Sequence, residues 1–345
     1  MTVGSMNFRS DNTLGCPREI LDAMAAVNDT PTHPYGNDPV TERLGPLVSQ
    51  IFEHEAFVFP VSTGTAANGL SLAAVTPPWG VIFCHPLAHI VRNEWCAPEF
   101  FTGGARLLTV DGDHGKISPQ ALVDRVTGST HAGKPATVSV TQATESGTIY
   151  TLDDLHAIAD VARRASLSVH MDGARFTNAL VSLGCSPADL SWRAGVDALA
   201  LDATKNGTLT AEAVVVFRRD LADEVAHRRK RAGQVASKMR FLSAQLEAYF
   251  ENDLWLRNAR AANAGVRRLA DGLSRIAGVA VVQPVEANLV FARLGASMRS
   301  SLRDQGFAFL DWPALGADVV RLICGFSTTD GQVDGLVSAV RALAD

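Results

Sequence analysis

Apolar residues along this chain fall into short continuous runs, and helical patterns follow several of them. Short apolar runs rich in β-branched residues are typical of buried strands. We expect strands at 56–60, 81–84, 105–110, 137–141, from 168, at 196–201 and at 213–217. The alternation of strands and helices over about residues 56–217 predicts an α/β fold with a mainly parallel sheet.

The segments outside this region follow other patterns. The remaining expected elements are helices from about 17, at 40–52 and over 222–269, strands at 279–282, 288–291 and 319–324, and a closing helix at 333–343. A chain of 345 residues is long for a single core. We therefore expect a large domain at 16–255 and a small α+β domain at 256–345. Residues 1–15 are expected to form an extended arm that packs with the small domain.

A lysine lies in the polar turn between two of the apolar runs. The turn reads Ala-Thr-Lys-Asn-Gly, with Lys205 at its centre. A buried ammonium must be paired, neutralised or bonded. Lys205 is therefore either a turn residue whose charged end reaches solvent, or a lysine that forms a Schiff base, a role that suits its readily shifted pKa.

A carboxylate and a guanidinium follow an earlier expected strand. The run that starts at 168 ends in Asp172-Gly-Ala-Arg175. Ligands of parallel sheets gather outside the carboxyl ends of the strands, where Lys205 would also lie. Pyridoxal phosphate requires a lysine for its aldehyde and a carboxylate that faces its pyridinium nitrogen. Asp172 is thus a candidate for that carboxylate, and its alternative role is the N-cap of a helix.

The segment 62–68, Ser-Thr-Gly-Thr-Ala-Ala-Asn, follows another expected strand and opens a helix. Free N–H groups and the positive end of the helix dipole make such a turn a potential phosphate site. Its spacing matches neither GxGxxG nor GxxxxGK, which disfavours dinucleotide and ATP binding. Taken alone, the segment is equally consistent with a plain tight turn.

Composition excludes several other classes of function. The net charge of −5 leaves no electrostatic footprint for nucleic acid, and the basic cluster at 228–231 is typical of a solvated helix face. Five scattered cysteines without CxxC spacing favour a reducing compartment over a disulfide framework or a zinc site. No signal pattern and no apolar run of about 18 residues is present, so we expect a cytoplasmic protein that does not contact membranes.

The histidines at 85 and 89 are spaced like metal ligands on a helix. Pro86 disrupts that face, however, and no carboxylate lies between the two histidines. We therefore expect no metal site.

Motifs from Phe8 to Ile323 resemble those of the threonine aldolase family, within the fold-type I pyridoxal phosphate enzymes and the β-eliminating lyase superfamily. In chain order the motifs are FRSDNT, YGNDPVTERL, STGTAAN, LAHI, HMDGAR, TKNG, SKMRF and VVRLI. They cover nearly the whole chain. HMDGAR and YGNDP are specific in combination with the downstream lysine turn, whereas STGTAAN or TKNG alone is a weak signal.

The resemblance assigns a role to each candidate residue. Lys205 would form the Schiff base with pyridoxal 5'-phosphate, and His89 would stack on the cofactor ring. The residues expected to hold the cofactor are Gly64, Thr65, Ala66, His89, Asp172, Arg175, Thr204, Lys205 and Arg240, the last of these from a neighbouring subunit. The residues expected to bind the substrate are Ser10, Tyr35, Arg175 and Arg321. A site shared in this way requires a homodimer or a homotetramer.

The chain departs from the commoner family pattern in two places. Its lysine turn reads Thr-Lys-Asn-Gly where many members have Ser-Lys-Gly, and Glu145 stands where a family histidine is thought to contact the substrate hydroxyl. Glu145 could act as a general base, orient His89 or bind a water. The catalytic candidates are Lys205, His89 and Glu145.

The resemblance implies a carbon–carbon lyase that cleaves L-β-hydroxy-α-amino acids, of the threonine, allo-threonine or phenylserine type, to glycine and an aldehyde. One alternative keeps the cofactor but changes the reaction to β-elimination or transamination. Another is a protein that binds the cofactor or an amino acid without turnover.

Overall fold

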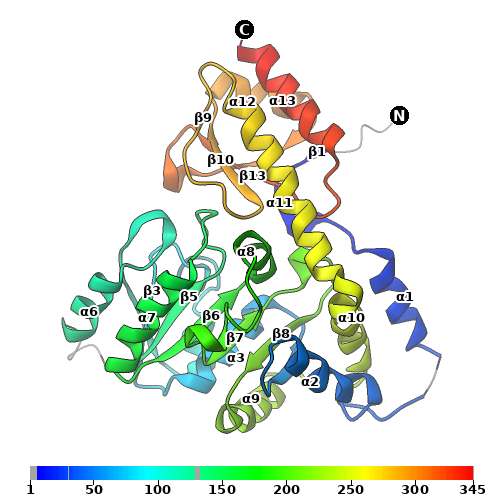
Figure 1. Ribbon diagram of the computed structural model, residues 1–345, viewed down its shortest axis with the longest axis vertical. Coiled ribbons are helices and arrows are strands. Elements are labelled where there is room, and N and C mark those ends of the chain that lie inside the picture. The colour runs from blue at the N-terminus through cyan, green and yellow to red at the C-terminus, as the bar shows by residue number, and fades with distance from the viewer. Residues whose placement is uncertain (1–5, 30, 129–132, 345) are drawn as a thin grey trace.

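The computed structural model describes residues 6–29, 31–128 and 133–344. Its larger part surrounds a seven-stranded sheet of order β2-β8-β7-β6-β5-β3-β4, and its smaller part contains a four-stranded sheet of order β12-β13-β10-β9. Helix α11 (Leu254–Leu273) runs from the larger part to the smaller one (Figure 1). The expected α/β fold with a mainly parallel sheet is confirmed.

The strands of the large sheet coincide closely with the apolar runs. They are β2 (Phe57–Val61), β3 (Gly80–Cys84), β4 (Arg106–Thr109), β5 (Lys134–Thr141), β6 (Ser168–Gly173), β7 (Ala198–Leu201) and β8 (Glu212–Val216). Strand β8 runs antiparallel to both β7 and β2, and the other pairs are parallel. The connection from β7 to β8 is the lysine turn, which contains only one short 3₁₀ helix and is too short for a parallel crossover.

Helices cover both faces of this sheet (Figure 1). The helices of the larger part are α1 (Arg18–Ala26), α2 (Pro39–Ile51), α3 (Gly64–Val75), α4 (His89–Arg92), α5 (Ala97–Thr102), α6 (Pro119–Gly128), α7 (Leu152–Arg164), α8 (Phe176–Leu183), α9 (Arg219–Arg231) and α10 (Arg240–Phe250), of which α1 packs on α10. Local signals set several of their ends. Thr151 and Asp154 form the expected capping box of α7, and the Asp38 carboxylate accepts the Thr41 N–H at the start of α2, 2.9 Å away.

The helical pattern over 222–269 proves to be three helices, α9, α10 and α11, rather than one. The break before α11 lies at Asn252 and Asp253, whose φ angles are 51° and 56°. Both residues tolerate this left-handed region better than most side chains do. A hydrophobic pattern continues through such a break, because the helices on either side bury the same kind of face.

The smaller part consists of β9 (Ala280–Val281), β10 (Leu289–Arg293), α12 (Ala296–Asp304), β11 (Phe307–Ala308), β12 (Leu310–Asp311), β13 (Val319–Ile323) and α13 (Asp330–Ala344). Strand β1 (Met6–Asn7), near the start of the chain, pairs in parallel with β11. The carbonyl of Phe8 also accepts the Ile323 N–H, 2.9 Å away. Helix α11 crosses the expected domain boundary at 255/256, so the position of that boundary stays a prediction.

Aromatic side chains pack together in the core of the larger part. The ring of Phe52 lies 5.9 Å from that of Phe176 and 5.5 Å from that of Phe217, all in one buried cluster.

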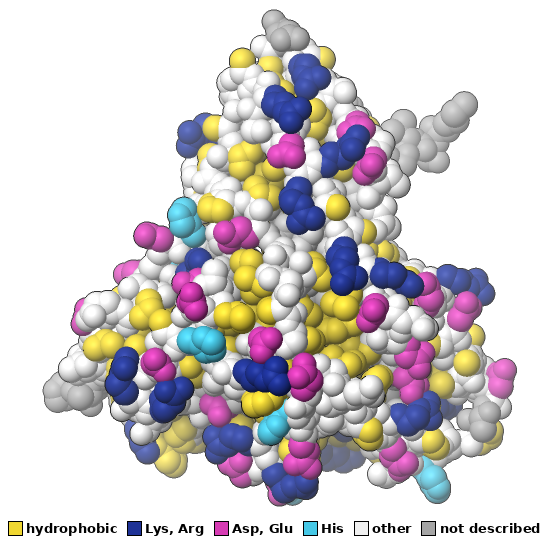
Figure 2. Space-filling view, in the orientation of Figure 1, with side chains coloured by type: hydrophobic (Ala, Val, Ile, Leu, Met, Phe, Trp, Pro, Cys, Tyr) yellow, Lys and Arg dark blue, Asp and Glu magenta, His cyan; other side chains and the backbone are white. Residues whose placement is uncertain are grey.

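On the face shown in Figure 2, Lys and Arg side chains are interspersed with Asp and Glu. Among the described residues, no helix combines the length and apolar character needed to cross a bilayer.

Candidate active site

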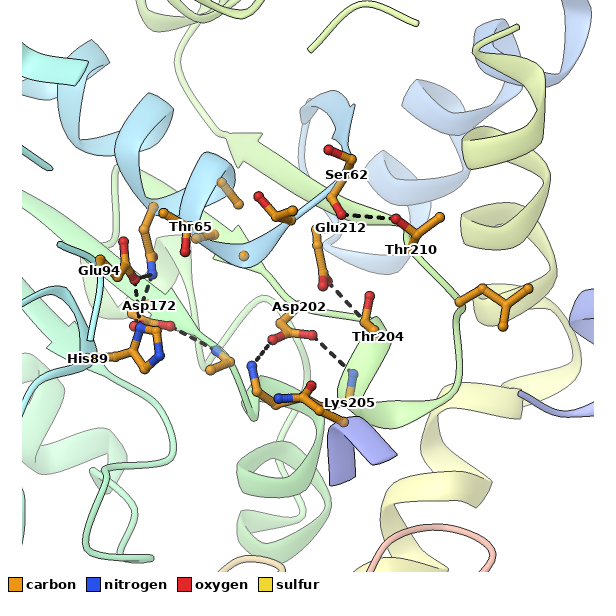
Figure 3. A pocket seen from close by; sticks show the side chains of 18 of the residues that line it. Ser62, Thr65, His89, Glu94, Asp172, Asp202, Thr204, Lys205, Thr210 and Glu212 are labelled. Carbon is orange, nitrogen blue, oxygen red and sulfur yellow. Dashed lines mark hydrogen bonds and ion pairs between the residues drawn. The ribbon is translucent and has the colours of Figure 1, made fainter. Parts of the chain in front are cut away.

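The ends of β6 and β7 and the first turn of α3 enclose a cavity of about 290 Å³ (Figure 3). Seven of the residues singled out from the sequence line it, namely Gly64, Thr65, His89, Glu145, Asp172, Thr204 and Lys205. The other six described candidates lie beyond its lining, namely Ser10, Tyr35, Ala66, Arg175, Arg240 and Arg321. The structure thus brings together the candidate lysine, the candidate carboxylate and the proposed phosphate turn.

The Asp172 carboxylate is buried at the end of β6. One oxygen accepts the Ala174 N–H at 3.1 Å, and the other accepts the Asn68 side-chain amide at 3.2 Å. Burial, reinforced by the nearby Glu94 carboxylate, raises the pKa of Asp172 to about 6. The N-cap of the following helix, α8, is Arg175 rather than Asp172. Asp172 is therefore a poorly solvated carboxyl that a cationic ring nitrogen would stabilise as an anion.

A buried polar network behind Asp172 went unnoticed in the sequence. The side-chain amide of Asn68 donates to Asp172 and also to Glu94, 2.9 Å away, and Glu94 bonds His89 Nδ1 at 2.8 Å. The bond to Glu94 raises the pKa of His89, although burial opposes this rise. The second oxygen of Glu94 and the amide oxygen of Asn68 have no hydrogen-bond partner among the described residues. Glu94 lies on a loop without a motif, so only the structure reveals it.

The lysine turn is a short 3₁₀ helix, η4 (Thr204–Asn206), and the side chain of its last residue, Asn206, holds it in place. The Asn206 amide donates to the Tyr249 hydroxyl at 2.8 Å and to the Trp255 carbonyl at 2.9 Å. Gly207 follows with φ +136°, where a side chain would also meet Asn258. The unusual Asn-Gly pair therefore anchors the turn on α10 and α11, which holds Lys205 at the cavity.

Two acidic side chains near Lys205 were also missed. The Asp202 carboxylate forms an ion pair with Lys205 Nζ and accepts the Lys205 N–H at 3.2 Å. Glu212, the first residue of β8, accepts the N–H groups of Ala203 at 2.5 Å and Thr204 at 3.3 Å. A glutamate that opens the buried strand Glu-Ala-Val-Val-Val was the available signal in the sequence.

The first turn of α3 presents unused donors to the cavity. The Thr63 hydroxyl accepts the Ala66 N–H at 3.1 Å, and the Thr63 carbonyl accepts the Ala67 N–H at 3.0 Å. No bond within the described residues occupies the N–H groups of Gly64 and Thr65. With the positive end of the helix dipole, these two groups form a site suited to a phosphate.

Arg175 is held by a buried carboxylate from the N-terminal segment. Its Nε and Nη2 donate to the two oxygens of Asp11 at 2.9 and 3.1 Å, and Asn288 donates to the same carboxylate at 3.2 Å. Burial raises the pKa of Asp11, but the positive charges of Arg175 and Lys205 outweigh this effect and hold it below its usual range. Asp11 lies in the FRSDNT motif, next to the candidate Ser10.

Arg321, on β13, approaches the site from the smaller part. Its guanidinium lies over the Trp312 ring, 4.4 Å from the ring centre, and its Nε has no partner among the described residues. Burial and the nearby charge of Arg175 lower its pKa. Trp312 also lines a second cavity of about 500 Å³, and Glu145 lines both cavities, so the two adjoin.

Three candidates occupy other positions in the single chain. The Ser10 hydroxyl accepts the Asn12 N–H at 3.2 Å, and Asn12 itself lines the cavity. Tyr35 is 51% exposed, with Lys230 over its ring. Arg240 donates from Nε to the Val27 carbonyl at 2.9 Å.

The residues present fit pyridoxal 5'-phosphate. The cavity offers an amine at Lys205, a carboxyl whose raised pKa a ring cation would relieve at Asp172, and free N–H donors at Gly64 and Thr65. Asp172 lies on β6, Lys205 lies in the turn after the neighbouring strand β7, and the donors lie on the helix whose first turn faces them (Figure 3).

Comparisons with known proteins agree with this chemistry. A family model described as beta-eliminating lyase matches residues 7–297. The chain is 41% identical, over 99% of both chains, to a low specificity L-threonine aldolase of Pseudomonas aeruginosa. It is 39% identical, again over 99% of both, to one of a Pseudomonas strain.

Solved structures extend the likeness to the fold. A threonine aldolase of Leishmania major superposes with a TM-score of 0.91 at 26% identity, over 98% of this chain and 99% of that one. A putative L-allo-threonine aldolase of Listeria monocytogenes shares the fold with a TM-score of 0.77 at 16% identity, over 97% and 95%. This chain therefore belongs to the threonine aldolase branch of the beta-eliminating lyase family, whose members depend on pyridoxal 5'-phosphate.

Proposed function

We propose that the protein cleaves the Cα–Cβ bond of L-β-hydroxy-α-amino acids of the threonine, allo-threonine or phenylserine type, releasing glycine and an aldehyde. The observation that carries this proposal is the shared cavity of Lys205 and Asp172, in a chain so similar to low specificity L-threonine aldolases. The bound cofactor supplies an electron sink for the carbanion that forms at Cα when the bond breaks.

Lys205 and Asp172 hold the reactive ends of the cofactor in this proposal. Lys205 supplies the amine for its aldehyde, and Asp172 faces the ring nitrogen and keeps a proton on it. The donors at Gly64 and Thr65, with Ala66 and Thr204, hold its phosphate. His89 stacks on its ring, oriented by Glu94.

The two arginines and Ser10 bind the substrate carboxylate. Both oxygens of Asp11 hold Arg175 in place, and the Nε of Arg321 has no hydrogen-bond partner within the described part of the chain. A carboxylate held in this way would orient the Cα–Cβ bond for cleavage, and the bound cofactor would supply the electron sink for that bond.

The substrate hydroxyl loses its proton to His89, to Glu145 or to a water that one of them holds. Because Nδ1 of His89 is bonded to Glu94, Nε2 is the nitrogen left to accept a proton. Glu145 lines the cavity beside it and borders the second cavity, which is suited to the β-substituent.

We also propose a homodimer or homotetramer whose subunits share the site. Arg240 and Tyr35 lie away from the cavity of their own chain, which supports roles in that of a neighbour. Large exposed aromatic side chains, such as Trp95 at 98% and Phe100 at 82%, favour burial between subunits. Turnover by a sedimenting monomer would contradict this assembly.

A cytoplasmic location completes the proposal. The five cysteines are free in the structure, which accords with a reducing compartment. Activity that fractionates outside the cytoplasm would contradict it.

Product analysis tests the reaction directly. Incubation with threonine and with phenylserine should yield glycine and the corresponding aldehyde in equal amounts. Ammonia with a keto acid would instead indicate β-elimination, and a keto acid without ammonia would indicate transamination. Spectral change without any product would indicate a binding protein.

A further inference from the structure

The proposed reaction leaves two carboxyl groups of the cavity unexplained, those of Asp202 and Glu212. Both side chains belong to the cavity lining, and their residues are 7% and 3% exposed. Figure 3 shows both carboxyl groups directed into the space beside Lys205. Burying a carboxyl group costs free energy unless the group is paired or hydrogen-bonded, so two of them beside one lysine require an explanation.

Asp202 holds Lys205 in a form that cannot react with an aldehyde. Its ion pair with Nζ favours the ammonium, which has no lone pair to attack a carbonyl carbon. Burial and the charge of Arg175 lower the pKa of Lys205, but the carboxylates of Asp202 and Asp11 raise it above its usual value. The cofactor-free lysine is therefore protonated at neutral pH.

The same carboxylate lies where the proposed phosphate site begins. Asp202 Oδ2 is only 3.7 Å from the point at which a side chain on Gly64 would start. Gly64 is the first residue of α3, and its N–H is one of the two free donors. A phosphate dianion at these donors would therefore lie close to the Asp202 carboxylate, and such a like charge favours protonation of Asp202.

Glu212 is the second carboxyl group beside Asp202. Burial and the adjacent Asp202 raise the pKa of Glu212 well above its usual value, which favours its neutral form. Its carboxyl group also accepts hydrogen bonds from the backbone N–H groups of Ala203 and Thr204. Two adjacent carboxyl groups disfavour a double negative charge, and a proton that leaves Lys205 has its ion-pair partner Asp202 as acceptor.

We propose that Asp202 gates Lys205: it keeps the lysine protonated until an aldehyde that carries a phosphate enters, and then accepts the lysine's proton. The proton moves from Nζ to Oδ2, the free amine attacks the aldehyde carbon, and a C=N bond forms as water leaves. Charge balances, because the ammonium and carboxylate become a neutral imine and a neutral carboxylic acid. The proposal rests on the assignment of Lys205 as the cofactor lysine.

The gate discriminates among aldehydes by their charge. A phosphate raises the proton affinity of Asp202, whereas an aldehyde without phosphate leaves the ion pair intact. The aldehyde released by the proposed reaction belongs to the second group. Asp202 thus protects the empty lysine from modification by the enzyme's own product.

The test compares pyridoxal 5'-phosphate with pyridoxal, which lacks the phosphate. Cofactor-free full-length enzyme is mixed with each aldehyde between about pH 6 and 9, and imine absorbance is followed by stopped flow. In wild-type enzyme pyridoxal should react slowly at neutral pH. Asp202→Asn should speed pyridoxal at least about tenfold, because each unit by which the lysine pKa falls raises the free-amine fraction tenfold. The rate ratio of the two aldehydes should fall accordingly.

Glu212→Gln is the matched control. It places the same neutral amide in the cavity but leaves the ion pair of Lys205 and Asp202, so pyridoxal should stay slow. Asparagine at 202 keeps an acceptor for the Lys205 N–H, and Asp202→Ser serves if the asparagine variant does not fold.

The outcomes separate the gate from the function on which it rests. Borohydride reduction followed by peptide mapping locates the imine in each reaction. A label on another lysine overturns the assignment of Lys205 and the gate with it. With the label on Lys205, unchanged pyridoxal kinetics in Asp202→Asn, or an equal acceleration in Glu212→Gln, overturns the gate alone.

Discussion

Removal of the Asp11 carboxylate should destabilise the protein and weaken substrate binding together. In Asp11→Ala, the Arg175 guanidinium loses both of its bonds to Asp11 and remains buried, since its side chain is only 5% exposed. Breaking a buried ion pair by deleting one partner costs about 3–5 kcal/mol. We expect a loss of that order in the free energy of unfolding.

The loss should depend on pH. The folded-state pKa of Asp11 lies below its usual value, so the stability that this group contributes is present above the unfolded pKa and is lost as pH falls through the folded value. The difference between wild type and Asp11→Ala should therefore be full at neutral pH and shrink in acid.

The kinetic effect follows from the position of Arg175. A hydrogen bond to a charged group is worth about 1.5–3 kcal/mol, so a displaced guanidinium should raise the KM for the amino acid by about 10- to 100-fold. The enzyme with bound cofactor would be unfolded in urea at several pH values and assayed with threonine.

Asp22→Ala is the control for that experiment. Its ion pair with Arg18 is exposed, with 56% of the Asp22 side chain accessible, so we expect little change in stability or KM. If Asp11→Ala were no less stable than this control, or kept a normal KM, Asp11 would not hold Arg175 as argued.

Three further predictions concern other parts of the site. Asp172→Asn should raise the urea midpoint of the cofactor-free protein at neutral pH, because a carboxyl group with a raised pKa destabilises the folded state once the pH has risen from 3.8 to above about 6. An unchanged midpoint would show that burial does not raise the pKa of Asp172. Glu94→Gln should lower the pKa of His89, measured by NMR of the imidazole, and shift the acidic limb of the pH–rate profile to lower pH. An unchanged limb would show that His89 does not take part in proton transfer. Trp312→Leu should raise KM by about 2- to 30-fold through loss of a cation–π contact with Arg321 worth about 0.5–2 kcal/mol, with kcat retained; an unchanged KM would show that the stack does not orient Arg321.

Much of the large sheet could be predicted from the sequence, because strands such as β3, β7 and β8 are buried on both faces and most of their residues are apolar. The same logic placed Asp172 and Lys205 at one edge, since strands β6 and β7 are parallel neighbours. The helix breaks near 232–239 and 251–253 could not be predicted, because apolar spacing persists across them.

The supporting residues of the site resisted prediction for a different reason. Glu94 and Asn68 act through contacts between segments distant in the chain, and no local spacing encodes such a contact. Asp202 was hidden because an acid beside a lysine is common on any surface. Arg240 and Tyr35 lie away from the cavity of their own chain, so their proposed roles depend on a partner that a single chain does not contain.

The assignment of Lys205 as the cofactor lysine is tested by locating the residue to which the cofactor is attached. The chain has only five lysines, at 116, 134, 205, 230 and 238, so peptide mapping after borohydride reduction distinguishes all of them. We expect a visible imine band that borohydride abolishes, a single modified peptide containing Lys205, and a folded, colourless Lys205→Ala variant. A reduced cofactor on another lysine, or a yellow Lys205→Ala variant, would contradict this assignment.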